Sequence, residues 1–254
     1  MVASRPRNIA APALPQRLPA AALVMVLLQG CASQPPYDPF KTPAADVRQR
    51  VHTIAIAPLS ASPNQLDIDA ARMAIEEQAA ARLRAGGYDV VPSAETERVW
   101  RRAAAEVGGV FDPVSGEVDE PRRDAVQAAI YRDLAAEHRA DAVLYLRVAP
   151  IAIYLPGGSV EYCGVEEAEP LYWPTGGSPD DPTLAVVLCL NAVLVDGEGR
   201  ELYGIRHGLE AVETYAQQTR AVRPVAERLR NPARLNAAVE ATLGPLAGAG
   251  RPAP

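Results

Sequence analysis

The feature of the sequence that most restricts the fold is a strand–helix–strand unit after residue 50. Residues 51–57 are rich in β-branched side chains and end at a proline, which predicts a buried strand. Every fourth residue from 71 to 83 is apolar, which predicts an amphipathic helix that ends at the glycine pair 86–87. A second strand is expected at residues 88–91. Because one helix joins the two strands, they should lie parallel in one sheet.

The rest of the chain predicts three further helices and three further strands. The helices are expected over 93–107, 121–138 and 231–246, and the strands over 141–155, 184–195 and 200–215. Asp196-Gly197-Glu198-Gly199 is a hairpin turn, and Pro150 predicts a sheet edge or a bulge. The order predicts an α/β (α+β) fold with one mixed sheet of about five strands. A parallel first pair and an antiparallel meander should form this sheet, covered by about four helices.

The N-terminal residues have the pattern of a secretory signal peptide. Three arginines precede an apolar run at residues 20–28, which is roughly half as long as the ~20 residues that span a bilayer. A basic leader, a short apolar run and a small residue before the cut predict a signal peptide over residues 1–30. Leu28-Gln29-Gly30-Cys31 resembles a bacterial lipobox, in which the cysteine is acylated, although Gln29 departs from the small residue usual there. The alternative is an ordinary signal peptide followed by an incidental cysteine.

The remaining chain is expected to consist of a tether and one domain. Residues 31–48 are proline-rich and should form an extended tether that lipid on Cys31 holds to the membrane. Ala32 follows Cys31 where an aspartate would retain the protein in the inner membrane, which resembles the sorting signal of outer-membrane lipoproteins. Residues 49–248 should form a single α/β domain with a loop insertion at residues 156–182.

Two cysteines remain if Cys31 carries lipid. In an oxidising compartment Cys163 and Cys189 are expected to form a disulfide. The bond would close a loop of about 26 residues, which contributes on the order of 3 kcal/mol in the chain-entropy model. The alternative is two independent apolar thiols.

Two segments of the chain resemble a family of envelope lipoproteins. One is Asp141-Ala142-Val143-Leu144-Tyr145-Leu146-Arg147-Val148, and the other runs from Leu194-Val195-Asp196 to Tyr203-Gly204. These lipoproteins are similar to the curli secretion lipoprotein CsgG and to the N-terminal domain of TolB. The resemblance covers about residues 50–245, apart from the insertion. It implies a fold and not an activity, because the matching residues belong to strand cores and turns.

The composition and the motifs exclude several classes of function. The formal net charge is −6, so a nucleic-acid-binding surface is not indicated. The sequence has three histidines and no CxxC, HExxH, GxSxG or Walker A motif, so we predict no metal, no cofactor and no enzyme. We interpret His138 as the last residue of a helix, where a positively charged imidazole interacts favourably with the helix dipole.

The insertion is the best candidate for a partner-binding site. Its aromatic and acidic residues stand close together: Tyr162, Glu166, Glu167, Tyr172 and Trp173. Exposed aromatic side chains beside acids are typical of a surface that recognises a protein or a glycan. The alternative is that Trp173 packs over the rim of the sheet and that the acids only keep the loop soluble.

We therefore expect a lipid-anchored outer-membrane protein that faces the periplasm and binds an envelope protein without catalysis, as a monomer or a homo-oligomer. One alternative is a subunit of a CsgG-type export channel, which would need spanning strands of about 9–11 alternating residues. Residues 110–120 and 156–182 lack that alternation. The other alternative is a hydrolase that uses the acidic pairs of the insertion, Glu166-Glu167 and Asp180-Asp181.

Overall fold

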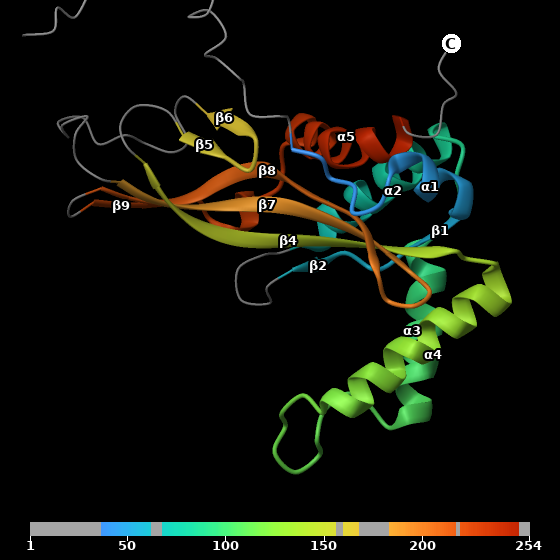
Figure 1. Cartoon of the computed structure of the whole chain (residues 1–254). Coiled ribbons are helices and arrows are strands. Elements are labelled where there is room, and N and C mark those ends of the chain that lie inside the picture. The colour runs from blue at the N-terminus through green and yellow to red at the C-terminus, as the bar shows by residue number, and fades with distance from the viewer. Residues whose placement is uncertain (1–36, 62–67, 156–159, 168–182, 217–218, 249–254) are drawn as a thin grey trace, which may run out of the picture. The chain divides into compact units, whose positions relative to one another are not determined.

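The computed structural model describes residues 37–61, 68–155, 160–167, 183–216 and 219–248. These residues form a mixed α/β fold, in which a seven-stranded sheet carries helices on both faces (Figure 1). The strands of this sheet are β1 (Thr53–Ile56), β2 (Ser60–Ala61), β3 (Asp89–Val91), β4 (Ala142–Leu155), β7 (Thr183–Asp196), β8 (Glu201–Ala216) and β9 (Thr219–Val222). The α-helices are α1 (Ala44–Arg50), α2 (Asp69–Ala85), α3 (Ser93–Val107), α4 (Glu120–His138) and α5 (Pro232–Gly248). The strand order is β3-β1-β4-β7-β8-β9, and β2 pairs with β4.

The predicted strand–helix–strand unit is confirmed. β1 pairs in parallel with β3 on one side and with β4 on the other. Asp141, the residue before β4, holds the start of β1, because its Oδ2 accepts hydrogen bonds from the backbone N–H groups of His52 at 2.8 Å and Thr53 at 2.9 Å. The parallel part of the sheet is therefore tied together where its strands begin.

The antiparallel meander is also confirmed. β4 pairs with β7 over its whole length, and β7 pairs with β8 through three register shifts. Such shifts bend a strand and increase its twist. Pro150 lies beyond the last residue that β2 pairs with, so within the described residues β4 is an edge at this point, as predicted.

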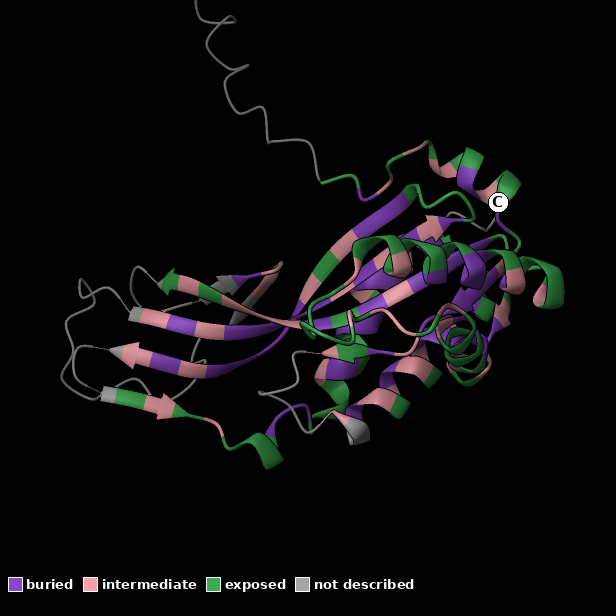
Figure 2. Ribbon diagram, turned by 90° about the horizontal axis from the view of Figure 1, so that it is seen from below, coloured by how far each residue is buried: buried purple, intermediate pink, exposed green. Residues whose placement is uncertain are grey.

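Two helical layers cover opposite faces of the sheet. α1, α2 and α5 pack on one face around Ile54, Leu144 and Leu190, and α3 and α4 pack on the other face around Ala55 and Val143. Figure 2 shows that the buried residues concentrate in the strands and on the inward sides of the helices. Alternate residues of one strand thus contribute to different hydrophobic clusters, as the two-residue period of a β-strand requires.

Three details of the predicted fold are wrong. The sheet has seven strands and not about five, because the short strands β2 and β9 add to it. There are five α-helices and not about four among the described residues, because α1 lies within the stretch expected to be tether. The compact unit accordingly starts at Pro39, and Val47 of α1 is buried in its core.

The insertion also contains regular structure. β5 (Val160–Tyr162) and β6 (Val165–Glu167) pair as a hairpin and form a second, two-stranded sheet. Residues 156–159 and 168–182, which include Tyr172, Trp173 and the acidic pair Asp180-Asp181, lie outside the described residues. The described helices include none that is long and apolar enough to cross a membrane.

Candidate functional site

The hairpin β5–β6 is bound tightly to the meander. Its two-residue turn consists of Cys163 and Gly164, both with positive φ, as the turn of a tight hairpin requires. The carbonyl oxygen of Cys163 accepts a hydrogen bond from the N–H of Gly208 at 3.1 Å, and Cys163 forms a disulfide with Cys189 of β7. The predicted pairing of the two cysteines is confirmed.

Tyr162 is part of this attachment and not an exposed contact. Its side chain is only 3% exposed and packs with Ala185, Val187 and Ala211. Gly208 makes the close packing feasible, because a Cβ atom there would lie 2.6 Å from Cε2 of Tyr162. The expectation that Tyr162 is exposed in a polar loop is therefore wrong. Its aromatic ring belongs to a small satellite core.

The structure describes only some of the other predicted site residues. Glu166 and Glu167 belong to β6, where Glu166 pairs with Glu161 and Glu167 with Val160. Tyr172, Trp173 and Cys31 lie outside the described residues. The predicted partner-binding cluster and the lipid attachment thus remain predictions.

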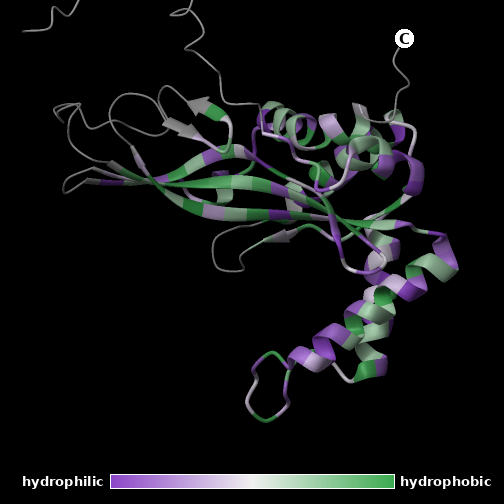
Figure 3. Cartoon of the chain, viewed as in Figure 1, coloured by the Kyte–Doolittle hydropathy of each residue, from purple (hydrophilic) through white to green (hydrophobic). Residues whose placement is uncertain are grey.

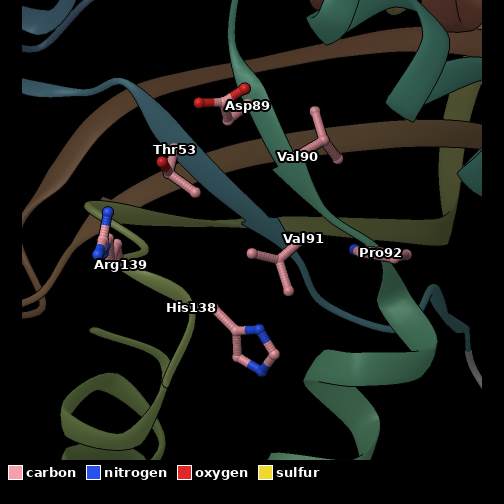
Figure 4. A pocket seen from close by; sticks show the side chains of 7 residues that line it. All are labelled: Thr53, Asp89, Val90, Val91, Pro92, His138 and Arg139. Atoms are coloured by element: carbon pink, nitrogen blue, oxygen red, sulfur yellow. The ribbon is translucent and has the colours of Figure 1, made fainter. Parts of the chain in front are cut away.

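A cleft of about 300 Å³ lies at the β3 edge of the sheet (Figure 4). It is lined by Thr53 of β1, by residues 89–92, and by His138 and Arg139 at the end of α4. Nε2 of His138 is buried and has no hydrogen-bond partner among the described residues. With a carboxylate on Asp89 and a guanidinium on Arg139, the cleft can accept a small polar ligand that carries both signs of charge.

The sequence located His138 correctly at the end of a helix, but it did not reveal the cleft. α4 ends there because Arg139 adopts the left-handed conformation, with φ of 57°. That ending places the imidazole against β3, a strand about fifty residues earlier in the sequence. The residues around His138 in the sequence give no indication that its side chain lies next to β3.

A second cleft, of about 420 Å³, lies at the carboxyl ends of β1 and β3. The chain leaves β1 toward α2 on one face and leaves β3 toward α3 on the other, an arrangement at which open α/β sheets commonly bind ligands. Glu76 lies in this cleft, but it is already engaged. Its Oε1 accepts the N–H of Leu59 at 2.7 Å, and its Oε2 accepts the hydroxyl of Ser93 at 2.5 Å. Glu76 therefore joins the two strand ends and is not free for chemistry.

The loop between α3 and α4 exposes apolar side chains. α3 and α4 pack against each other and run away from the sheet, so that the loop lies at their far end (Figure 1), and Figure 3 shows hydrophobic residues on it. Phe111 is 57% exposed, Val114 is 94% exposed and Val118 is 46% exposed. We call these three residues the tip surface. The sequence showed only that residues 110–120 lack the alternation of a membrane-spanning strand, and it did not indicate an apolar surface.

Hydrogen bonds and a β-bridge stabilise the backbone of this loop. Oδ1 of Asp112 accepts the N–H groups of Val114 and Ser115, both at 2.8 Å. These backbone hydrogen bonds, from Ser115 first and then Val114, hold the pKa of Asp112 below its usual value. Phe111 and Val118 form a β-bridge across the loop. Hydrogen bonds within the loop therefore hold the backbone that carries the tip surface.

The described residues contain no group of three or more His, Cys, Asp and Glu side chains that could hold a metal ion.

Comparisons with known proteins add distant structural likenesses. No protein-family model matches the chain, and the comparison with curated proteins gave no match. Two solved structures of PelC from Paraburkholderia phytofirmans, which is a dodecamer, match with 15% identity and TM-scores of 0.32 and 0.33. The matches cover 78% of this chain and 89% and 88% of those chains.

A neuraminyllactose-binding hemagglutinin homolog from Helicobacter pylori matches with 12% identity and a TM-score of 0.33. That match covers 82% of this chain and 90% of the other. At these identities and TM-scores, the likenesses assign no activity to this chain.

Proposed function

We propose that this protein is a lipid-anchored envelope protein that binds a protein partner in the periplasm and performs no catalysis itself. The tip surface is the observation that carries the binding role. Phe111 and Val118 face each other across the loop and Val114 lies between them in the sequence, and exposed apolar side chains grouped in this way are typical of an interaction site. The tip surface lies at the far end of α3 and α4, and hydrogen bonds within the loop hold its backbone, which lowers the entropic cost of binding.

The chemistry of the loop favours a protein over a membrane as the partner. Asp112, Glu117, Asp119 and Glu120 lie in or beside the loop, where Arg122 pairs with Asp119 and Arg123 pairs with Glu120. The anionic headgroups of a bilayer would repel the two remaining carboxylates, Asp112 and Glu117, which have no ion pair among the described residues. A protein surface with an apolar pocket and a basic rim would complement both the apolar side chains and the acids.

Two further observations support the envelope location. The Cys163–Cys189 disulfide fits an oxidising compartment, since cytosolic proteins seldom keep such bonds. Leu28-Gln29-Gly30-Cys31 supplies a candidate acylation site, and more than one acyl chain on this cysteine would anchor the protein stably to a membrane. The resemblance of residues 50–245 to envelope lipoproteins agrees with this location.

Intact-mass measurement of the full chain expressed in a Gram-negative host tests the anchor. We expect the mass of a chain that begins at Cys31 and carries acyl groups, found in the outer-membrane fraction. The substitution Cys31→Ala should shift the protein out of that fraction. A soluble, unacylated chain that still carries residues 1–30 would refute the location.

A photo-crosslinking side chain placed at Val114 tests the tip surface. Met73 on α2 is 65% exposed and serves as a matched control position. We expect one defined envelope protein to crosslink at position 114 and not at position 73. Val114→Asp should abolish co-purification of the same protein and leave the thermal stability unchanged. Equal crosslinking at both positions would show that the tip surface is not the binding site.

A further inference from the structure

The second half of β4 is an edge of the sheet. β2 pairs with β4 only as far as Val148, whereas β4 continues to Leu155 (Figure 1). On its inner side this segment pairs with β7 residue by residue, up to the pair of Leu155 with Thr183. On its outer side it forms no backbone hydrogen bond to any of the described residues. We call residues 149–155 the β4 edge.

The backbone groups on this outer side belong to alternate residues. The N–H and C=O groups of one strand residue point to the same side, and the side alternates along the strand. The C=O of Leu144 accepts the N–H of Ala57 at 2.9 Å, so even-numbered residues of β4 point away from β7. The register between β4 and β7 has no shift, so the alternation continues to the end of β4. The N–H groups of Ala152 and Tyr154 and the C=O of Pro150 therefore face outward.

Apart from Pro150, the β4 edge lacks the features that keep the sheet edges of monomeric proteins from pairing. Such edges usually carry a lysine, an inward-pointing charge or a bulge. The β4 edge contains no charged residue and no bulge. On one face Ala152 is exposed and Tyr154 is 78% exposed. On the other face Ile151 and Ile153 are partly buried. An apolar strand edge of this kind favours the addition of another strand.

The β4 edge is complementary to its own copy in antiparallel pairing. When Ala152 lies opposite Ala152 of a second copy, the outward N–H of each donates to the outward C=O of the other. In the same register Tyr154 lies opposite Pro150 of the second copy, so the N–H of Tyr154 meets a free C=O. The proline has no N–H, so only the return bond is missing. Ile153 lies opposite Ile151 on the other face, and no two like charges meet.

The other two-fold registers use the edge less well. An axis at Pro150 would place two prolines opposite each other, and neither has an N–H to donate. An axis at Tyr154 would pair only residues 153–155 within β4. The register about Ala152 pairs the whole β4 edge and uses both of its outward N–H groups.

A second copy suits this edge better than a peptide from another protein. Edge strands recognise a particular peptide through pockets for its alternate side chains, or through charge. The β4 edge has no charge, and neither of the two clefts described above is lined by its residues. Pairing about a two-fold axis covers the free edges of both copies at once, so the assembly ends at two, which is the commonest form of protein oligomer.

We propose that this protein forms a two-fold dimer in which the β4 edges of two copies pair in antiparallel fashion about Ala152. The two sheets then form one continuous sheet across the axis. This interface is separate from the tip surface, which lies on the loop between α3 and α4, and it does not depend on that surface.

Cysteine substitution in the purified full chain under mild air oxidation tests the register. The two Cα atoms at position 152 should lie about 5.5 Å apart, within the range of a disulfide. We expect Ala152→Cys to give a disulfide-linked dimer on a non-reducing gel. The unmodified chain, which retains its own three cysteines, gives the background.

Tyr154→Cys is the matched control. Position 154 is well exposed, but its two copies should lie about 14 Å apart in this register, which is too far for a disulfide. It should therefore give about tenfold less dimer than Ala152→Cys. A mixture of Tyr154→Cys and Pro150→Cys chains should restore the dimer, because these positions lie opposite each other.

Ala152→Lys tests the interface without a crosslink. Two lysines would lie directly opposite each other and repel, so the dissociation constant of the dimer should rise about tenfold or more. Sedimentation of the purified full chain measures this constant. Met73→Lys, at a position of α2 that is 65% exposed, is the control and should leave the constant unchanged. Near-ultraviolet circular dichroism confirms that each variant is folded.

The other outcomes would overturn the proposal. A dimer of Tyr154→Cys as abundant as that of Ala152→Cys would mean that the chains meet by random collision. A chain that stays monomeric at all concentrations would refute the dimer. Linkage of Ala152→Cys to a different protein in an envelope extract, with no linkage to a second copy, would assign the edge to a foreign peptide. A loss of partner crosslinking at Val114, by contrast, would refute the tip surface alone.

Discussion

At the scale of single residues, Asp141, Asp196 and Tyr203 have structural roles in the sheet and its turns. Asp141 accepts two backbone N–H groups at the start of β1. Asp196 closes the turn between β7 and β8. Tyr203 is fully buried, and its hydroxyl donates to the carbonyl oxygen of Thr242 in α5 at 2.5 Å. Each of these side chains stabilises the fold through a hydrogen bond to the backbone.

Asp141→Ala should lower the free energy of unfolding by about 1 kcal/mol, because two backbone N–H groups lose their charged acceptor at a solvent-exposed site. Urea unfolding followed by circular dichroism measures the change. Glu106→Ala, at an exposed position of α3, should change the stability by a few tenths of a kcal/mol. A loss no larger for Asp141→Ala than for this control would contradict the role assigned to Asp141.

Asp196 should make the stability depend on pH. Burial opposes ionisation of its carboxyl, but the hydrogen bonds from the side chain and backbone of Arg200 and from the N–H of Glu198 outweigh it and hold its pKa below the ordinary value of 3.8. Because the pKa is depressed in the folded state, the stabilisation is present above 3.8 and is lost as the pH falls through the folded pKa.

Asp196→Asn tests this dependence. We expect it to cost about 1 kcal/mol at neutral pH. The difference between the two proteins should shrink at a pH well below 3.8, where the carboxyl is protonated in both states. Urea unfolding of both proteins across this range gives the answer. A difference that is constant with pH would show that the charge of Asp196 does not stabilise the turn.

At the scale of elements, the hairpin β5–β6 depends on three attachments. These are the disulfide, the backbone hydrogen bond from Gly208 to Cys163, and the packing of Tyr162. A two-stranded hairpin is at best marginally stable alone, so its order must come from the strands beneath it.

Removal of the disulfide by Cys163→Ser with Cys189→Ser should lower the free energy of unfolding by about 3 kcal/mol, because the closed loop restricts the unfolded chain. Hydrogen exchange should rise in β5 and β6 before it rises elsewhere. Chemical reduction of the unmodified protein is the control and should have the same effect. An unchanged unfolding midpoint would mean that packing alone holds the hairpin.

At the scale of the whole molecule, β7 is the central element. β4 and β8 flank it, and its residues contribute to the clusters on both faces of the sheet. The backbone amides of residues 188–194 should therefore exchange with solvent most slowly, at the rate of global unfolding. Those of the edge strand β9 should exchange by local opening. Hydrogen exchange followed by mass spectrometry measures both, and equal protection of β9 and β7 would contradict a core centred on β7.

Much of the architecture could be predicted because it rests on local patterns. The β-branched run near residue 54, the four-residue apolar period of α2 and the Asp196–Gly199 turn each specify an element from neighbouring residues. The short strands β2 and β9 could not be predicted, since two to four residues carry no detectable period. α1 was missed for a related reason, because a proline-rich context masks a helix of 7 residues.

The candidate sites could not be predicted, because they depend on contacts between residues that are far apart in the sequence. The sequence by itself determined the candidate lipid attachment at Cys31 and the order of the main elements, because both depend on residues that are neighbours in the chain. Only the tertiary structure decided that Tyr162 is buried, that His138 meets β3, and that the second half of β4 lies beyond the end of β2. The register between distant strands sets these proximities, and that register results from the packing of the whole core.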